Sequence, residues 1–360
     1  MRILLLAHGP SIHTRRWATA LRDRGHNILL LTAHAGEDVG VPARVVGSPS
    51  PVRALHYWSA LGAVRRELRA FCPDVTVAHF LPNYGFLAAL AQARPWMLVC
   101  WGSDLLTNAR LSPLHRARAR YVLRRAGLIH VDAAVLAEAA VALGAPPARV
   151  WTRPWGVGAG AFERAGEPRP SRNGAEAARL LWTRQLEPVY DPETFVRALG
   201  LLKRRGFTFR ATMAGDGPLR ASVEAWVREE DVTREVVLEG FVGSDRLRAL
   251  HREGDLYISL SRSDSTSQSL LEAMAAGLVP IVSDIAGNRE WVTHRQEGYL
   301  VPVGDANALA CAIAEASTDP AADAYRARAG AAVKARASFA DTLDQLEAKL
   351  DALAGSGSAP

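Results

Sequence analysis

Cysteine is rare in this chain of 360 residues, and long apolar runs are absent. The three cysteines, Cys72, Cys100 and Cys311, are odd in number and widely separated, which argues against a disulfide framework and a zinc site. No apolar run reaches the roughly 18 to 20 residues that a membrane span requires. The first ten residues hold too few apolar side chains for a signal peptide, so we expect a buried strand there. We therefore expect a reduced, cytoplasmic location, with peripheral contact at the inner membrane face left open.

Lysine is almost missing as well, and the usual metal-binding patterns do not occur. The net charge of +6 comes from 40 arginines against three lysines. Arginine binds phosphates and other oxyanions bidentately. The sequence has no DNA-binding motif and no basic stripe interleaved with aromatic residues, so we expect no nucleic-acid partner. No Asp-x-Asp pair and no His, Asp or Glu cluster with metal-ligand spacing is found, so we predict no metal and no other cofactor.

Apolar strands alternate with amphipathic helical segments along almost the whole sequence. The run 2–9, RILLLAHG, is followed by a helical pattern and then by the strand-like run 26–33, HNILLLTA. The second half of the chain repeats this alternation, from RLLWTRQ to GYLVPV. The pattern predicts an α/β fold with two Rossmann-like, doubly wound domains that face each other across a cleft.

A segment rich in glycine, proline and charge interrupts the alternation after about residue 158. We predict an N-terminal domain over 1–160, a linker over 161–178 and a C-terminal domain over 179–325. We also predict a single C-terminal helix over 326–353, packing back toward the N-terminal domain, and a flexible tail over 354–360.

Residues 261–277 place five serines and a threonine in front of a short apolar helix. A strand-like run before them puts Asp264 on the loop at a strand's carboxyl end, and we expect the helix to start at Ser267 or Ser269. One interpretation is structural, because Ser269 and Glu272 have the spacing of a capping box. The other is functional: a small-residue loop leading into a helix N-terminus is typical of an anion site. A nucleotide diphosphate would fit there, with one acid on each side for sugar hydroxyls.

The same stretch resembles the signature of the retaining family 4 glycosyltransferases of GT-B fold, the glycosyl transferases group 1. The family pattern is S-x-x-E-G-F-G-x-x-x-x-E-A-M-A, and residues 261–275 read SRSDSTSQSLLEAMA. Asp264 stands in place of the first Glu, and STS replaces Gly-Phe-Gly. Further family motifs follow in the expected order: RGH at 24–26, DVTVAHFLPNYG at 74–85, GSD at 102–104, MAGDGPLR at 213–220, EGFV at 239–242 and NREWV at 288–292.

The resemblance implies roles in donor binding and catalysis. Asp264 would contact the hydroxyls of the transferred sugar, and Glu272 would hold the ribose. Arg184 would neutralise the departing diphosphate, although an ordinary surface arginine is the plain alternative. Asp264, Arg184 and His79 are therefore the catalytic candidates. The other implied donor contacts are Gly9, Tyr190, Gly215, Val242, Gln268, Ser269 and Leu270.

This chain departs from the family where a lysine is usual, five or six residues after Arg184. Val189 and Tyr190 stand there instead, and a tyrosine hydroxyl can bind phosphate but carries no positive charge. On the acceptor side the candidates are His13, Trp101 and Asp104.

Each acceptor-side interpretation has a structural alternative. His79 would bind the acceptor or sugar, or would be a structural histidine. Trp101 takes the place of the family's frequent histidine, so it would stack on a sugar or pack in the core. Asp104 would contact the acceptor or cap a helix. Gly9 would give the donor room, or would be a plain turn glycine.

The predicted function is therefore metal-independent, retaining transfer of a hexosyl-type sugar to a hydroxyl acceptor, from a nucleotide sugar with UDP preferred. The acceptor would be a glycan, a glycolipid or a small molecule. A nucleotide-sugar epimerase or hydrolase of the same fold, or a weakly active nucleotide-sugar-binding protein, remain the alternatives. Residues 109–127 carry six arginines with apolar residues at helical spacing. They would form either a peripheral contact with an anionic membrane or a solvated basic face.

Overall fold

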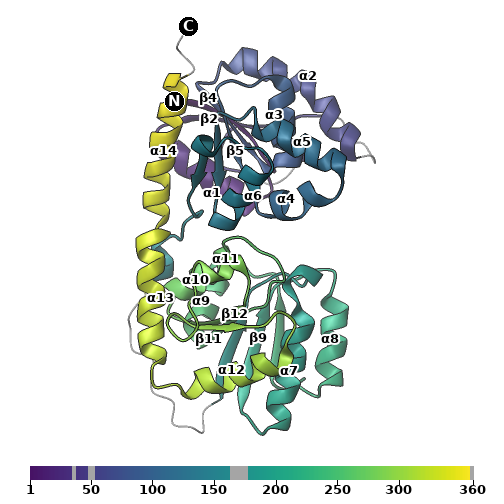
Figure 1. Cartoon of the computed structure of the whole chain (residues 1–360), viewed down its shortest axis with the longest axis vertical. Coiled ribbons are helices and arrows are strands. Elements are labelled where there is room, and N and C mark those ends of the chain that lie inside the picture. Colours follow the sequence, from purple (N-terminus) through teal and green to yellow (C-terminus); the bar gives the residue numbers. More distant parts are fainter. Residues whose placement is uncertain (35–37, 48–52, 163–176, 357–360) are drawn as a thin grey trace. The chain divides into compact units, whose positions relative to one another are not determined.

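The computed structural model describes residues 1–34, 38–47, 53–162 and 177–356. The chain divides into two compact units, one formed by Met1–Pro154 with the chain from Asp341 onward, the other by Trp155–Ala340 (Figure 1). The boundary between the units therefore falls after Pro154 in the chain, six residues before the predicted boundary at 160. The predicted linker at 161–178 begins within a short 3-10 turn, Ala159–Phe162, and ends inside a strand; its residues 163–176 lie outside the described ones.

The described residues of the first unit form a seven-stranded sheet in the order β3-β2-β1-β4-β5-β6-β7, with parallel neighbours throughout. Its strands are β1 (Arg2–Leu6), β2 (Asn27–Thr32), β3 (Ala43–Val45), β4 (Val75–His79), β5 (Trp96–Val99), β6 (Leu128–Val131) and β7 (Val150–Thr152). Its helices are α1 (Ile12–Asp23), α2 (Arg53–Phe71), α3 (Phe86–Ala91), α4 (Ser103–Leu106), α5 (Pro113–Leu123), α6 (Ala134–Ala142) and α14 (Phe339–Ser356).

In the second unit, the described strands form a six-stranded parallel sheet in the order β10-β9-β8-β11-β12-β13. The strands are β8 (Ala178–Trp182), β9 (Phe209–Ala214), β10 (Val236–Gly240), β11 (Leu256–Ser259), β12 (Val279–Ser283) and β13 (Tyr299–Val301). The helices are α7 (Pro192–Arg204), α8 (Arg220–Glu229), α9 (Ser244–Glu253), α10 (Gln268–Ala275), α11 (Ala286–Arg289), α12 (Ala306–Thr318) and α13 (Ala322–Arg336).

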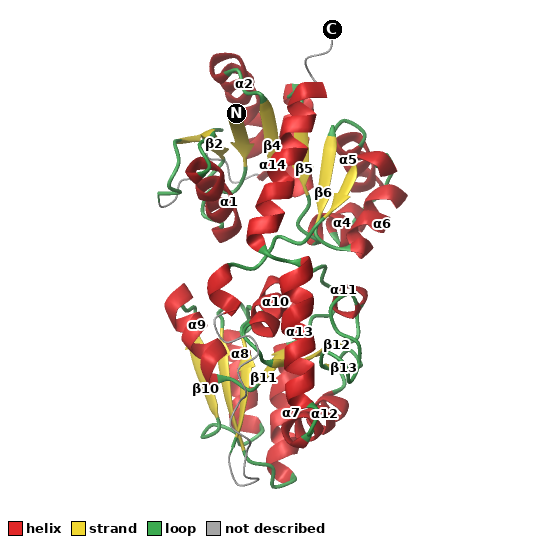
Figure 2. Cartoon of the chain, turned by 90° about the vertical axis from the view of Figure 1, so that its left-hand side faces the viewer, coloured by secondary structure: helices red, strands yellow, loops and turns green. Residues whose placement is uncertain are grey.

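Both sheets have the doubly wound strand order. In each, the chain builds outward from its first strand and then returns to that strand's other side, so the order reverses between β1 and β4 and between β8 and β11. Helices flank the strands of each unit (Figure 2). The predicted pair of parallel α/β sheets is confirmed. In open sheets of this kind, ligands bind beyond the carboxyl ends of the strands at the reversal.

Several strands are apolar on both faces, so both faces of each sheet must be buried beneath helices. The strand Ile3–Leu6 is fully buried, and so are Val279–Val282 of β12. Strands buried on both faces are typical of parallel sheets between helices. Polar side chains mark the helix starts, where Ser11 caps α1 and Ser112 caps α5.

The C-terminal segment differs from the predicted single helix over 326–353. It forms two helices, α13 and α14, which are separated at Ala337 and Ser338. The helix stops there because Val157 N–H donates to the Ala337 carbonyl at 2.7 Å, and Phe339 N–H donates to the Val157 carbonyl at 3.0 Å. α13 belongs to the second unit and packs on α10, whereas α14 lies with the first unit (Figure 1). The predicted tail is helical as far as Ser356, and 357–360 are not described.

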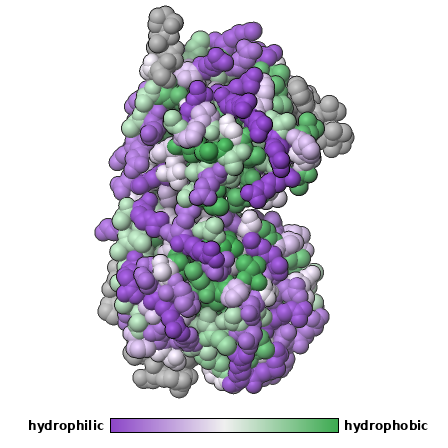
Figure 3. All heavy atoms as spheres, viewed as in Figure 1, coloured by the Kyte–Doolittle hydropathy of each residue, from purple (hydrophilic) through white to green (hydrophobic). Residues whose placement is uncertain are grey.

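On the face shown in Figure 3, hydrophilic and hydrophobic residues are interspersed on both units. No helix in the described ranges is long and apolar enough to cross a membrane.

Truncation of Leu350 tests how much α14 contributes to the first unit. Leu350 is fully buried, and its neighbour Lys349 is exposed on the same helix. We expect Leu350→Ala to lower the free energy of unfolding by about 2 to 5 kcal/mol, because it removes buried apolar atoms and leaves a cavity. Urea unfolding followed by circular dichroism measures the loss, with Lys349→Ala as the control. Equal stability of the two variants would show that α14 does not stabilise this unit.

Candidate functional site

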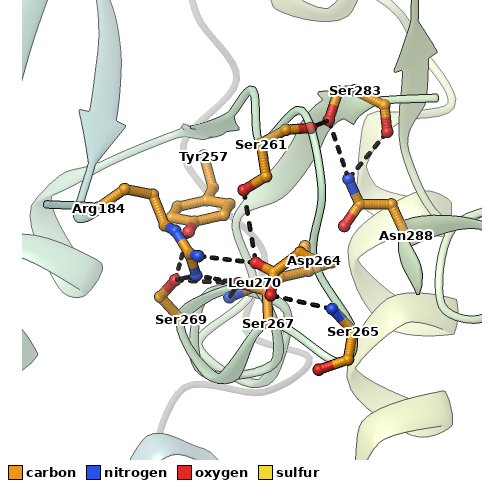
Figure 4. Close-up of polar contacts among 10 residues, drawn as sticks. All are labelled: Arg184, Tyr257, Ser261, Asp264, Ser265, Ser267, Ser269, Leu270, Ser283 and Asn288. Carbon is orange, nitrogen blue, oxygen red and sulfur yellow. Dashed lines mark hydrogen bonds and ion pairs between the residues drawn. The ribbon is translucent and has the colours of Figure 1, made fainter. Parts of the chain in front are cut away.

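Arg184 and Asp264 meet at the point where the second sheet reverses its strand order. Arg184 follows β8 and Asp264 follows the neighbouring β11. Arg184 Nη2 donates to Asp264 Oδ2 at 2.7 Å, and the two side chains are only 11% and 19% exposed (Figure 4). Burial acts to lower the pKa of Arg184, but Asp264 and then Tyr257 outweigh it, so the pKa is raised overall. The guanidinium is therefore a fixed positive charge at this edge of the sheet.

Two serine hydroxyls hold the other end of the guanidinium. Arg184 Nη1 donates to Ser267 Oγ at 2.6 Å and to Ser269 Oγ at 3.1 Å (Figure 4). The Tyr257 hydroxyl also donates to Ser269 Oγ, at 2.7 Å, and the two serine oxygens lie 3.1 Å apart. Arg184 therefore lies directly at the N-terminus of α10.

The start of α10 corrects the predicted capping box. Ser267 is the N-cap, and its Oγ accepts the Leu270 N–H at 3.3 Å. Ser269 and Glu272 lie within the helix, so they cannot form the box that their spacing suggested. Of the two predicted helix starts, Ser267 and Ser269, the structure has the first, as the N-cap. Because Leu270 N–H is engaged, Gln268 and Ser269 are the first-turn residues whose amides have no intrahelical or capping acceptor.

The side chains of Gln268 and Glu272 are connected along one face of α10. Gln268 Nε2 donates to Glu272 Oε1 at 3.1 Å and to the Gly156 carbonyl at 3.0 Å. Glu272 is half-buried, and Gln268 links it to the segment that enters the second unit. Glu272 thus has a structural partner of its own, separate from Arg184.

Tyr190 packs its ring against Arg184. The guanidinium carbon lies 4.0 Å from the ring centroid, a cation–π distance. Burial raises the pKa of the Tyr190 hydroxyl, against the effect of Arg184. The Arg262 N–H donates to the Val189 carbonyl at 2.8 Å, so the loops after β8 and β11 are joined beside this ring. The residue in place of the family's lysine therefore supports Arg184.

Two glycines allow the loops of the site to pack this closely. A Cβ at Gly215, the predicted donor contact, would lie 2.2 Å from the Arg184 carbonyl. One at Gly287 would lie 2.1 Å from the Ser265 carbonyl and 2.8 Å from that of Asp264. Gly287 could not be selected from the sequence, because the Ser265 carbonyl that it packs against is 22 residues away in the chain.

Two further hydrogen bonds stabilise the loop after β11. The Ser283 hydroxyl donates to the Ser261 carbonyl at 2.6 Å, and Asn288 Nδ2 donates to the Ser283 carbonyl at 2.8 Å (Figure 4). These residues were also missed, since nothing in their spacing relates them to Asp264.

Val242, the predicted base contact, is half-buried and lies two residues beyond Gly240. Gly240 pairs with Ala214, which immediately precedes Gly215. The chain after β10 thus runs beside the GDGP turn, at the same edge of the sheet as Arg184.

The candidates in the first unit lie near its own strand reversal. Gly9 follows β1 and His79 ends β4, and these strands are neighbours. Gly9 N–H donates to Thr32 Oγ1 at 3.0 Å, and a Cβ at Gly9 would meet Thr32 at an ordinary 3.4 Å. Packing within this unit therefore does not require glycine at this position.

Aromatic rings enclose His79. Trp17 and Trp101 contact it at ring-centroid distances of 5.6 and 6.0 Å, and His13 lies 5.6 Å from Trp101. His79 is 1% exposed, and burial lowers its pKa to about 3. A neutral, enclosed imidazole is poorly suited to proton transfer or sugar contact, so this geometry favours the structural interpretation of His79. His13 and Trp101 are half-buried.

Asp104 is a structural acceptor. Its carboxylate receives the N–H groups of Leu81 and Trp101, each at 3.2 Å, and the residue is fully buried. Burial raises its pKa to about 6, against those hydrogen bonds. The carboxylate joins the loops after β4 and β5, which favours a backbone-capping role over acceptor contact.

Within the described ranges, no three His, Cys, Asp or Glu side chains are grouped so that they could hold a metal ion.

Two family sequence models match the chain. The family described as "Glycosyl transferases group 1" matches residues 167–336, and the one described as "Glycosyl transferase 4-like domain" matches residues 8–156. Together the two matches cover most of both units.

Curated relatives include bacterial polysaccharide enzymes. Amylovoran biosynthesis glycosyltransferase AmsK of Erwinia amylovora is 32% identical over 144 residues, which are 37% of this chain and 35% of that protein. Putative colanic acid biosynthesis glycosyltransferase WcaL of Salmonella typhimurium is 27% identical over 259 residues, 69% of this chain and 62% of that protein. The chain thus spans about a third to three fifths of the length of these relatives.

Solved structures share the fold over nearly the full chain. Sucrose-phosphate synthase from Thermosynechococcus elongatus has a TM-score of 0.82 and 17% identity, covering 99% of this chain and 100% of that one. Anabaena Alr3699/HepE in complex with UDP has a TM-score of 0.79 and 18% identity, covering 98% and 100%. This likeness establishes the fold.

Replacement of Gly287 tests the packing that holds the Asp264 loop. We expect Gly287→Ala to lower stability by about 1 to 3 kcal/mol, because the new methyl group would displace the Ser265 backbone. Gly243→Ala is the matched control, since a Cβ there meets nothing within 4 Å. Melting temperatures of both variants measure the effect. An unchanged melting temperature for Gly287→Ala would mean that the loop adapts without cost.

Proposed function

Since the chain belongs to the group 1 glycosyltransferases of GT-B fold, we propose that it transfers a hexosyl-type sugar from a nucleotide sugar to a hydroxyl acceptor. We propose UDP as the nucleotide, retention of anomeric configuration, and no requirement for a metal. The observation that carries the proposal is the position of Arg184, fixed at the N-terminus of α10 beside the strand reversal. A diphosphate there would meet one permanent positive charge and free first-turn amides.

The proposed phosphate site combines three sources of positive potential. The guanidinium of Arg184 can bind phosphate oxygens bidentately. The amides of Gln268 and Ser269 point out of the first turn of α10, and the helix dipole adds to their effect. As the bond to the sugar breaks, negative charge grows on the diphosphate, and these groups stabilise it without a metal.

UDP as the proposed nucleotide is supported by a structural relative. Anabaena Alr3699/HepE has been solved in complex with UDP, with UDP and glucose, and with UDP-glucose. We propose that Val242 and Gly215 lie near the base, and that Glu272 holds the ribose. Gly9 would provide room for the donor, because packing in its own unit leaves that glycine unexplained.

The proposed reaction exchanges one bond at the anomeric carbon. The bond from that carbon to the diphosphate oxygen breaks, and the acceptor hydroxyl forms the new bond on the same face of the sugar. The hydroxyl proton passes to the departing phosphate oxygen. His13 and Trp101 would contact the acceptor, whose chemical class is a glycan, a glycolipid or another small hydroxyl compound.

Loss of Arg184 should abolish most of this activity. We expect Arg184→Gln to reduce the rate of transfer from UDP-glucose by roughly 30- to 1000-fold, because a charge-assisted contact to the leaving group is lost. Release of UDP over a set of hydroxyl acceptors measures the rate. Arg197→Gln, an exposed arginine of the same unit, is the control and should behave like the parent.

Four results would contradict the proposal. A rate for Arg184→Gln within about threefold of the parent would remove this residue from the site. Loss of activity in EDTA with recovery in Mg²⁺ or Mn²⁺ would contradict metal independence. Conversion or hydrolysis of UDP-glucose without any acceptor would favour the epimerase or hydrolase, and tight binding without turnover would favour a binding protein.

We also propose that the first unit contacts an anionic membrane through α5 and the turn before it. Leu111 and Leu114 are 62% and 77% exposed at the start of this helix. Arg116, Arg120 and Arg124 follow at intervals of four residues, and all three are exposed. The sequence from 105 to 131 contains no Asp or Glu. Exposed leucines beside an unopposed basic stripe favour an interface with acidic lipid headgroups.

Vesicle sedimentation tests this contact. We expect the protein to bind vesicles of phosphatidylglycerol and phosphatidylcholine, and not phosphatidylcholine alone. The double substitution Leu111→Ser and Leu114→Ser should weaken binding by about tenfold or more, because the apolar area that enters the interface is lost. Val45→Ser with Val141→Ser is the control, since both valines are exposed in the same unit. Equal binding by the two double variants would leave the basic stripe as a solvated face.

A further inference from the structure

Both carboxylate oxygens of Asp264 accept hydrogen bonds from its own unit. Its Oδ2 accepts Arg184 Nη2 at 2.7 Å and the Ser261 hydroxyl at 3.4 Å, and its Oδ1 accepts the Ser265 N–H at 3.0 Å (Figure 4). The family resemblance instead assigned this acid to the hydroxyls of the sugar. Here the side chain of Asp264, which is shorter than the glutamate of the family pattern, points to Arg184.

Asp264 also changes the net charge that a diphosphate would meet. Among the described residues, it provides the one carboxylate paired with Arg184. The remaining partners of the guanidinium are neutral: the hydroxyls of Ser267 and Ser269 and the ring of Tyr190. The charge of Arg184 is therefore balanced by Asp264, and a phosphate that binds there must compete with this carboxylate.

We propose that Asp264 is a positioning residue that acts as an internal counter-ion, competing with the nucleotide diphosphate for Arg184. The proposal rests on the function proposed above, and it adds a role in product release. The serines and the tyrosine ring keep the guanidinium beside α10. After transfer, the Asp264 carboxylate competes with the free nucleotide diphosphate for the guanidinium and so lowers the affinity for that product.

The competition follows from the shared chemistry of the two anions. Carboxylate and phosphate oxygens both accept from the same planar N–H fork. Removing the carboxylate should leave Arg184 in place, because Ser267, Ser269 and the Tyr190 ring still hold it. Its positive charge would then act on the phosphate alone. If Asp264 only contacted the sugar, its substitution would not change the affinity for a nucleotide that carries no sugar.

Calorimetric titration with UDP, which has no sugar, separates these roles. We expect Asp264→Asn to bind UDP about threefold or more tightly than the parent, and UDP to become a correspondingly stronger product inhibitor of transfer. Asp264→Glu keeps the charge and should retain nearly the parental affinity. Asp264→Ser serves in place of the Asn variant if that protein fails to fold.

A double-mutant cycle shows whether the effect acts through Arg184. Arg184→Gln should weaken UDP binding, and adding Asp264→Asn to it should change the affinity no further. Asp284→Asn is the charge-matched control: Asp284 follows the next strand, β12, and pairs with Arg289 on the surface. It should leave UDP affinity unchanged.

The outcomes are distinct. Unchanged or weaker UDP binding by Asp264→Asn would overturn the counter-ion role while leaving the proposed function standing. Equal tightening by Asp284→Asn, or by Asp264→Asn in the Arg184→Gln protein, would also overturn it, because the effect would then be a general change of field. No binding of UDP, ADP, GDP or dTDP by any variant would refute the donor site itself, and the counter-ion role with it.

Discussion

The reversal of strand order between β8 and β11 is the constraint on which the site depends. It brings the loops after two strands to one point, although Arg184 and Asp264 are 80 residues apart in the chain. Helices leave those loops in opposite directions around the sheet, so a gap remains at its edge. Gly215 and Gly287 then allow neighbouring backbones to approach within distances that a side chain would forbid. The side chains of Arg184 and Asp264 lie close together because the backbones of their loops pack closely.

Within this frame, neutral groups orient a single charge. The two serine oxygens and the tyrosine ring fix the plane of the Arg184 guanidinium, and Asp264 balances its charge. Orientation and charge balance are therefore provided by different residues. A substitution at Asp264 can therefore change the charge balance while the other contacts of Arg184 are kept.

Much of the fold could be predicted from the sequence, because apolar periodicity is a local signal. It indicated both parallel sheets, and the serine-rich stretch narrowed the start of α10 to Ser267 or Ser269. Pairings between distant segments could not be predicted. The break between α13 and α14 arises from Val157, which is 180 residues from Ala337, and the role of Gly287 arises from a carbonyl of another loop. The capping-box expectation was wrong because Ser267 and Ser269 are both good caps by residue type, and it is Ser267 whose hydroxyl accepts the Leu270 N–H.

It matters for a protein that handles sugars that the positive charge of the site is carried by an arginine and not by a lysine. An unprotonated lysine amine condenses with the open-chain aldehyde of a reducing sugar to give an imine. The chain's three lysines lie on α7, α13 and α14, and none lies in the loops after β8 and β11. A guanidinium stays protonated at any physiological pH and is a far poorer nucleophile. With Arg184 as the cation and Tyr190 beside it, the site carries its positive charge in a form that resists glycation by sugars in solution.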